Sequence, residues 1–161
     1  MVDSNSLRAL YRRPGFLLKR CHQVSAALFL EECREFQMTP SQYGALTVLA
    51  QYPGIDQIAL GRLTGLDRST AGLVLKLLSQ RGLIERAINP KDKRRMRLKL
   101  SKEGERTLAA MAGAAKRAQE RSLAGLPKDK REQFLDILEA YLAGHDAVID
   151  VSMALNGGWV E

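Results

Sequence analysis

The sequence has little of what builds disulfide frameworks or membrane spans. Two cysteines among 161 residues are too few for a disulfide framework, and on one straight helix Cys21 and Cys33 would lie about 18 Å apart, too far for a bridge. No apolar run approaches the roughly 20 residues that cross a bilayer, and the N-terminus shows no basic stretch followed by an apolar one. With 45% hydrophobic and 27% charged residues, the composition is that of a soluble globular chain. We expect a cytoplasmic protein with a folded core, built as one compact domain or as one domain with helical extensions.

The sequence also lacks the motifs of catalysis and metal binding. It contains no glycine-rich phosphate loop, no Gly-x-Ser-x-Gly elbow and no convincing cluster of catalytic side chains. The two histidines, His22 and His145, have no neighbours at metal-ligand spacing. We therefore expect a protein that is not an enzyme and that uses no cofactor and no metal.

The positive charge of the chain is concentrated in one segment. The formal net charge is +7. Residues 61–100 hold eleven lysines and arginines and three acids, a net charge of +8, whereas the rest of the chain has fourteen bases and fifteen acids. A solvated basic face is the simplest explanation, but a polyanion partner is favoured because the charge is confined to a segment with its own folding signals. Nucleic acid is the first candidate for that partner.

Helical periodicity is clear on both sides of this basic segment. Apolar residues recur at helical spacing over three ranges, residues 14–37, 101–122 and 128–149. A capping box at Thr39 and Gln42, with Pro40 at the first helical position, predicts another helix over residues 40–51.

The next part of the chain has the pattern of a helix-turn-helix. A short helix over residues 56–63 is followed by a turn at Gly65 and by a second helix, which Asp67 caps and Gly82 ends in the left-handed conformation. Ala59 offers the small side chain that two closely packed helices need. Four apolar residues are expected to fix the crossing of the helices: Leu63, Leu66, Val74 and Leu77.

After the second helix the apolar period changes from helical to two. Residues 83–88 are predicted to form a strand, residues 89–94 a loop, and Met96, Leu98 and Leu100 the apolar side of a returning strand. This hairpin should turn its apolar face inward and carry a cationic tip. A β-hairpin directly after a helix-turn-helix is a wing, so the predicted fold class is mainly α with a small β-hairpin wing.

This arrangement resembles the MarR family of winged helix-turn-helix transcription regulators over nearly the whole chain. The resemblance is carried by residues 67–86, which combine the second helix, its glycine stop and the following strand. It is also carried by residues 89–104, which combine the wing with the start of the next helix. Asn89 departs from the family pattern, in which an aspartate often precedes the proline.

The resemblance implies a homodimer in which the first and last helices of both subunits interlock. Residues 1–37 and 102–161 would form the helical dimerisation region, and residues 38–101 the DNA-binding domain. A physical reason supports this, because broad apolar stripes at both ends of the chain cannot all be buried against one small winged domain. Such a dimer would hold two recognition helices about 34 Å apart and read a near-palindromic operator in double-stranded DNA. Repression is the commonest mode of the family.

Candidate DNA contacts lie first on the recognition helix. Its N-terminal end should enter the major groove and bring Arg68, Ser69, Thr70 and Leu73 toward base edges, with Lys76 nearer the DNA backbone. Ordinary capping of the first helical turn is the alternative role of Ser69 and Thr70. Gly72 is expected to be a bare position that lets the helix backbone approach DNA closely.

The wing provides the second group of candidate contacts. Arg94 matches the family position that enters the minor groove, where a narrowed groove concentrates negative potential. Asp92 looks like the family's positioning acid, which holds a nearby arginine. The other wing cations should contact phosphates and make affinity fall with salt: Lys91, Lys93, Arg95 and Arg97.

The resemblance further implies a small ligand, often aromatic or phenolic, between the dimerisation helices and the winged domain. Candidate pocket residues supply aromatic walls and a cation for a carboxylate: Phe16, Arg20, His22, Phe29, Met38, Tyr43 and Leu46. Packing in the core is the alternative role of the aromatic residues and the methionine. Residues 12–20 look like those of family members that control aromatic-acid catabolism, some of which sense an aromatic acyl-CoA thioester.

Three other functions remain open. A nonspecific architectural DNA-binding protein has the same basic composition, and a protein-interaction module could use the wing for an acidic partner. Peroxide-sensing relatives carry a reactive cysteine in the first helix, which makes Cys21 a candidate redox sensor. Its place in an apolar stripe with Leu17, Val24 and Leu28 favours a packed, inert thiol instead.

Overall fold

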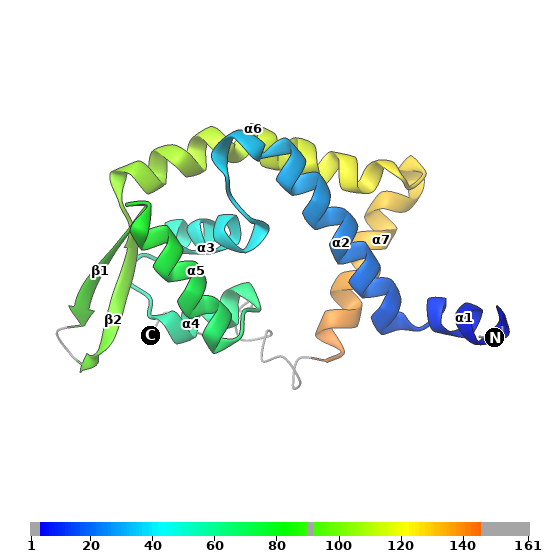
Figure 1. Ribbon diagram of the computed structural model, residues 1–161, viewed down its shortest axis with the longest axis horizontal. Coiled ribbons are helices and arrows are strands. Elements are labelled where there is room, and N and C mark those ends of the chain that lie inside the picture. Colours follow the sequence, from blue (N-terminus) through cyan, green and yellow to red (C-terminus); the bar gives the residue numbers. More distant parts are fainter. Residues whose placement is uncertain (1–3, 90–91, 146–161) are drawn as a thin grey trace.

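The computed structural model describes residues 4–89 and 92–145, which form helices and one two-stranded antiparallel sheet (Figure 1). In chain order the elements are α1 (Ser4–Tyr11), α2 (Pro14–Glu32), the 3-10 helix η1 (Arg34–Phe36), α3 (Pro40–Gln51), α4 (Gln57–Thr64), α5 (Arg68–Gln80), β1 (Ile84–Asn89), β2 (Asp92–Leu100), α6 (Lys102–Ala124) and α7 (Lys128–Ala143). The predicted fold class is confirmed. None of the described helices is both long and apolar enough to cross a membrane.

The long helix α6 joins two parts of the molecule. In Figure 1, α3, α4, α5 and the hairpin lie together near the start of α6, whereas α2 crosses α6 and descends beside α7. The core lies where α3, α4 and α5 meet α6 and the base of the hairpin. Its fully buried side chains come from all of these elements: Leu46, Leu49, Leu60, Leu75, Leu78, Leu98 and Met111. Each such side chain contributes about 1.5–3 kcal/mol, so the helix-turn-helix is held firmly on α6.

Local side-chain caps determine where α3 and α5 begin. The Thr39 hydroxyl accepts a hydrogen bond from the Gln42 N–H at 3.2 Å, and the Gln42 side chain accepts one from the Thr39 N–H at 2.9 Å. Asp67 caps α5, and Gly65 and Gly82 adopt φ angles of 68° and 67° after α4 and α5. The predicted capping box, the predicted cap and the left-handed Gly82 are therefore confirmed.

The N-terminal region differs from the prediction. Helix α1 lies before residue 14, where the sequence predicts no helix. Helix α2 ends at Glu32 instead of near residue 37, because the chain leaves the helical conformation at Cys33 and passes through η1 to Gln37, whose φ is 50°. This turn brings Met38 into the core. The predicted end of the last helix at residue 149 lies outside the described residues.

The strands of the hairpin reach further into the predicted loop than expected, and the apolar face of the hairpin is only partly covered. Ile84 pairs with Leu100 and Ile88 pairs with Met96, and the strands include most of the predicted loop over residues 89–94. Ile84 is buried against the core, but Ile88 and Met96 are 63% and 40% exposed. The prediction of an inward apolar face therefore holds at the base and is wrong at the outer end, because the hairpin extends beyond the helices that could cover it.

Helices α4 and α5 pack closely at Gly61. A Cβ on Gly61 would lie 3.0 Å from the Leu66 carbonyl oxygen and 3.6 Å from the Ala71 Cβ. Gly61 and Ala71 are both small and buried, so they allow this contact, while Ala59, to which the sequence assigned the same role, is half-buried. Leu77 is 38% exposed and lies outside the crossing, because it is on the solvent side of α5.

An ion-pair cluster joins α2 to the C-terminal half of α6. The Glu32 carboxylate accepts hydrogen bonds from Arg121 Nη1 at 2.7 Å and from Arg117 Nε at 2.9 Å, and Arg121 also reaches Glu31 at 3.1 Å. The hydrogen bond from Arg121, followed by that from Arg117, lowers the pKa of Glu32 below its ordinary value of 4.5. This cluster fixes the position at which α2 crosses α6.

Replacing Glu32 by glutamine should lower the melting temperature at neutral pH, because two arginines lose their shared carboxylate. A carboxyl group whose pKa is lowered by folding stabilises the fold above its unfolded pKa, and this stabilisation is lost as the pH falls toward the folded pKa. The difference in Tm between wild type and Glu32→Gln should therefore be constant at neutral pH and shrink below about pH 4.5. Thermal melts across this range measure it. Glu120→Gln is the control, because Glu120 is exposed and its carboxylate lies 3.9 Å from the Lys116 amine, a long and weak ion pair. A difference in Tm for Glu32→Gln that does not change with pH would contradict the stabilising role of the Glu32 carboxylate.

Candidate DNA interface and ligand pocket

The recognition helix α5 presents its N-terminal residues to solvent. Arg68, Ser69 and Lys76 are exposed, and Thr70 is half-buried. Leu73 is 57% exposed, although it is apolar and Leu75 and Leu78 of the same helix are fully buried. A leucine on this surface suits contact with an apolar group such as a thymine methyl. The five predicted contacts of this helix are therefore accessible to a partner.

Asp67 organises the start of α5. Its carboxylate accepts the Ser69 hydroxyl and the Thr70 hydroxyl, each at 2.6 Å, and also the backbone N–H groups of both residues at 2.9 Å. The Ser69 hydroxyl, then the Thr70 hydroxyl, hold the pKa of Asp67 far below its ordinary range. Both hydroxyl hydrogens are thus engaged in capping, and the hydroxyl oxygens keep only acceptor capacity for another partner.

Gly72 does not have the predicted role. A Cβ at this position would lie 3.3 Å from Nε2 of Gln57, and the same Nε2 donates to the Arg68 carbonyl oxygen at 3.2 Å. Gly72 therefore makes room for a side chain of α4 that bridges to α5. The prediction that Gly72 is bare toward a partner is wrong, because the residue lies on the side of α5 that faces α4.

The wing continues the basic surface. Arg97 is exposed, and Lys91 lies outside the described residues. The pairing shifts after the Ile88–Met96 pair, so β2 has an irregular stretch over residues 93–95. Four predicted contact residues belong to the outer half of β2: Asp92, Lys93, Arg94 and Arg95. In contrast, Lys99 at the base is paired with Glu85 at 2.9 Å, and this pair raises the pKa of Lys99.

Arg81, just after α5, connects the recognition helix to the segment that follows α2. Its guanidinium donates to the carbonyl oxygens of Phe36 at 2.8 Å and Gln37 at 2.9 Å, and it contacts the Met38 sulfur. These hydrogen bonds satisfy carbonyl groups of the turn around η1. The end of α5 is therefore attached to the linker between α2 and α3.

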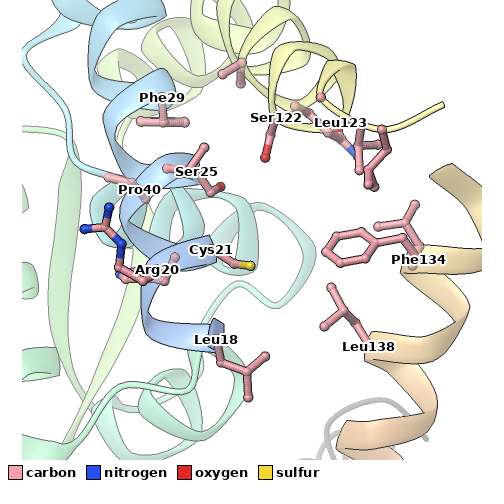
Figure 2. A pocket seen from close by; sticks show the side chains of 18 of the residues that line it. Leu18, Arg20, Cys21, Ser25, Phe29, Pro40, Ser122, Leu123, Phe134 and Leu138 are labelled. Carbon is pink, nitrogen blue, oxygen red and sulfur yellow. The ribbon is translucent and has the colours of Figure 1, made fainter. Parts of the chain in front are cut away.

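A cavity of about 1010 Å³ opens between α2, α6 and α7, with α3 at one side (Figure 2). Three aromatic rings line it, those of Phe29, Tyr43 and Phe134. Figure 2 shows Phe134 on the wall opposite Cys21. Three further residues supply basic groups: Arg20, His22 and Lys116. A largely apolar cavity with a few basic groups is typical of a site for a small organic anion.

The structure brings together four of the seven predicted ligand residues, Arg20, His22, Phe29 and Tyr43. The other three do not line the cavity. Phe16 packs on Tyr11 of α1, with 5.3 Å between ring centroids, while Met38 and Leu46 are fully buried in the core. For these three, the alternative role as packing residues is the correct one.

The wall formed by α6 and α7 was missed in the sequence. It contributes nearly half of the lining, including Ala115, Lys116, Gln119 and Ser122 of α6 and Phe134 and Leu138 of α7. Their helical spacing was visible, but the same spacing is expected of a packing stripe. Only the crossing of α2 over α6 reveals that these stripes border a cavity.

Cys21 is predicted to be packed, and this prediction is wrong for the described chain, whereas the predicted inertness of its thiol stays a prediction. Cys21 is exposed and lines the cavity, whereas Cys33 is the buried cysteine. The apolar stripe of α2 that contains Cys21 borders the open cavity instead of packing against another helix. Burial raises the pKa of the Cys33 thiol.

Within the described residues no three His, Cys, Asp or Glu side chains gather as a metal site would require.

Comparisons with known proteins agree with this geometry. A model of the MarR family matches residues 36–95. The transcriptional regulator HosA of Escherichia coli O111:H- is 33% identical over 130 residues, which cover 81% of this chain and 95% of HosA. The structure of the transcriptional repressor CouR bound to a 23-mer DNA duplex has a TM-score of 0.74 and 31% identity, covering 82% of this chain and 94% of CouR. The PcaV transcriptional regulator from Streptomyces coelicolor, in complex with its natural ligand, has a TM-score of 0.73 and 32% identity, covering 83% and 94% of the two chains.

A helix-turn-helix followed by a basic hairpin defines the chain as a winged helix-turn-helix protein. It belongs to the MarR family and is a DNA-binding transcriptional regulator. The resemblance based on the wing and the recognition helix is confirmed, and the relatives are transcriptional regulators, not enzymes.

Proposed function

We propose that the protein is a homodimeric, sequence-specific repressor that leaves its operator when it binds an aromatic carboxylate or the CoA thioester of one. The observation that carries this proposal is the cavity between α2, α6 and α7. Its lining includes residues of α2 and α3, and Arg81 attaches the linker between these two helices to the end of the recognition helix. The relatives include a repressor bound to DNA and a regulator bound to its natural ligand.

Dimerisation through residues 1–37 and 102–161 is supported by apolar side chains that the single chain leaves exposed. Ten of them lie on α1, α2 and α7: Leu7, Leu10, Tyr11, Leu17, Leu18, Val24, Leu30, Ile137, Tyr141 and Leu142. Apolar side chains gathered on helices from both ends of the chain need a partner, and a second copy related by a two-fold axis would bury them. The two copies of α5 would then face successive major grooves of a near-palindromic operator.

Operator recognition is assigned to residues 38–101, with α5 in the major groove and the wing beside it. Arg68 and Lys76 would bind base edges or phosphates, with Leu73 against an apolar base group. In the wing, Arg94 would enter the minor groove, positioned by Asp92, and Lys91, Lys93, Arg95 and Arg97 would neutralise phosphates. The net charge of +8 over residues 61–100 supports this assignment.

The ligand class follows from the chemistry of the cavity. Phe29, Tyr43 and Phe134 suit an aromatic ring, and the cations at Arg20 and Lys116 suit an anionic group. The volume is at the upper end of the range for small-molecule sites, so it admits more than one ring, which favours the thioester. Ligand entry would move α2, and Arg81 would transmit this movement to α5 through the linker.

The decisive experiment is operator release. The promoter DNA next to the protein's own gene is titrated at physiological salt, first without ligand and then with benzoate, benzoyl-CoA or the neutral control benzamide. We expect binding at least about 1000-fold tighter than to bulk DNA, and release by an anionic aromatic compound but not by benzamide. Equal affinity for bulk DNA would favour the architectural alternative, and binding to no DNA would favour a protein-interaction module. If calorimetry detects no binding of any aromatic acid or of its CoA thioester, the proposed ligand class is wrong.

A redox response through Cys21 is the second candidate, favoured by the exposure of this thiol in the cavity. Under mild peroxide, mass spectrometry should then find oxidation at Cys21 and not at the buried Cys33. Operator affinity should fall at the same peroxide dose and stay unchanged in Cys21→Ser. Oxidation without any change in operator affinity would exclude this response.

A further inference from the structure

The outer end of the wing carries an apolar pair that contributes little to the fold. Ile88 and Met96 stand opposite each other in the β1–β2 ladder, and both are exposed, Ile88 more than Met96. Because side chains alternate along a strand, this pair continues the hairpin face that carries the buried Ile84 and Leu98 at the base. The core therefore uses the inner rungs of this face and leaves the outermost regular rung to solvent.

Positive charge flanks the apolar pair on both sides. Arg86 lies on the same face, one rung toward the base, whereas Arg97, next to Met96, belongs to the opposite face of the hairpin; both are exposed. Toward the tip, the irregular stretch over residues 93–95 consists of a lysine and two arginines. An apolar surface between two groups of cations matches the edge of a DNA groove, where the C–H groups of deoxyribose lie between rows of phosphates. An apolar protein partner would not require these cations.

We propose that Ile88 and Met96 pack against the deoxyribose walls of the DNA minor groove. This inference rests on the proposed contact between wing and operator, and it adds a nonpolar component to it. Isoleucine and methionine are among the apolar residues that minor-groove proteins insert between base steps, so both side chains are compatible with this groove. Such a contact removes apolar surface from water but releases no counterions, so it adds affinity that does not depend on salt.

The double variant Ile88→Thr/Met96→Gln tests this contact. Threonine keeps the β-branch and glutamine keeps the length of the side chain, so the hairpin is retained while its apolar surface shrinks. Fluorescence anisotropy with the promoter DNA should give a Kd about tenfold higher at every salt concentration, with the slope of log K against log salt unchanged. Arg97→Gln is the matched control on the neighbouring position, and it should reduce that slope by about one.

Hydroxyl-radical footprinting examines the same contact directly, because these radicals cleave DNA by attacking deoxyribose from the minor groove. Wild type should protect deoxyriboses beside each half-site. The double variant should lose the protection of these sugars and keep the rest of the footprint. Ile88→Val/Met96→Leu, which stays apolar, should behave as wild type. An unchanged Kd and footprint in the double variant would overturn the inference, as would a loss of affinity in the apolar variant. Wild-type protein that prefers no operator would instead overturn the proposed function and this inference with it.

Discussion

Gly104→Ala is expected to destabilise the protein by about 3 kcal/mol, the largest effect on stability that a single added methyl group should have here. Gly104 lies in the first turn of α6, and a Cβ at this position would overlap the Leu83 carbonyl group. Ser101 holds this junction closed, since its N–H donates to the Leu83 carbonyl oxygen at 3.0 Å and its hydroxyl accepts from the Gly104 N–H at 3.0 Å. The obstacle is backbone, so it cannot move aside as a flexible side chain would.

The same helix supplies the control for this prediction. Gly113 is exposed, and the nearest atom to a Cβ there is Nη1 of Arg117 at 3.6 Å. Gly113→Ala should therefore stabilise α6 by about 0.5–1 kcal/mol, because alanine is the better helix former. Urea unfolding of both variants at one protein concentration measures the difference. Similar free energies of unfolding for the two variants would contradict the close approach of α6 to the Leu83 carbonyl group.

The elements predicted correctly are those that neighbouring residues specify. The capping box needs only Thr39 and Gln42, and the start of α5 needs only Asp67 and the two residues it holds. The turn at Gly82 follows from the positive φ that only glycine adopts easily. Signals of this range are visible in the sequence because all partners lie within one helical turn.

The features missed are those that depend on how distant segments meet. In the sequence, nothing distinguishes Gly61 and Gly104 from other glycines, because their close contacts with α5 and with the Leu83 carbonyl group arise only in the fold. Arg81 looks like a DNA-binding cation in the sequence, although it binds carbonyl groups more than 40 residues away. The sequence places Arg81 in the basic segment, but charge alone does not distinguish a cation that faces solvent from one that ties two helices together.

The candidate pocket was predicted only on the side of α2 and α3. Arg20 and Tyr43 were found because the first helices have aromatic and basic residues, which stand out against an apolar stripe. On α6, Ala115 and Gln119 are small or neutral and show nothing beyond helical periodicity. The packed position predicted for Cys21 failed for the same reason, since periodicity identifies a face but not whether that face meets another helix or a cavity.

Arg94→Ala is expected to weaken operator binding by about 1–3 kcal/mol, or roughly 5- to 150-fold in Kd. The irregular stretch of β2 at residues 93–95 interrupts the ladder near the end of the hairpin, and such irregularities re-aim side chains. An arginine in a narrow minor groove meets a stronger negative potential than one at an isolated phosphate. The expected loss therefore exceeds that for a phosphate-binding lysine of the wing.

Arg106→Ala is the matched control for charge. Arg106 lies on α6 outside the basic segment, is exposed, and pairs with Glu103 at 2.6 Å. Its removal should change operator affinity by less than about twofold.

Arg94→Lys separates shape from charge, because lysine keeps the positive charge but is more strongly hydrated and should restore only part of the affinity. Replacing A·T by G·C pairs in the operator where the wing binds should widen the minor groove. If this replacement lowers the operator affinity of wild type but not that of Arg94→Ala, the arginine acts in the minor groove. Equal weakening of both proteins by that substitution would assign Arg94 to the phosphates instead.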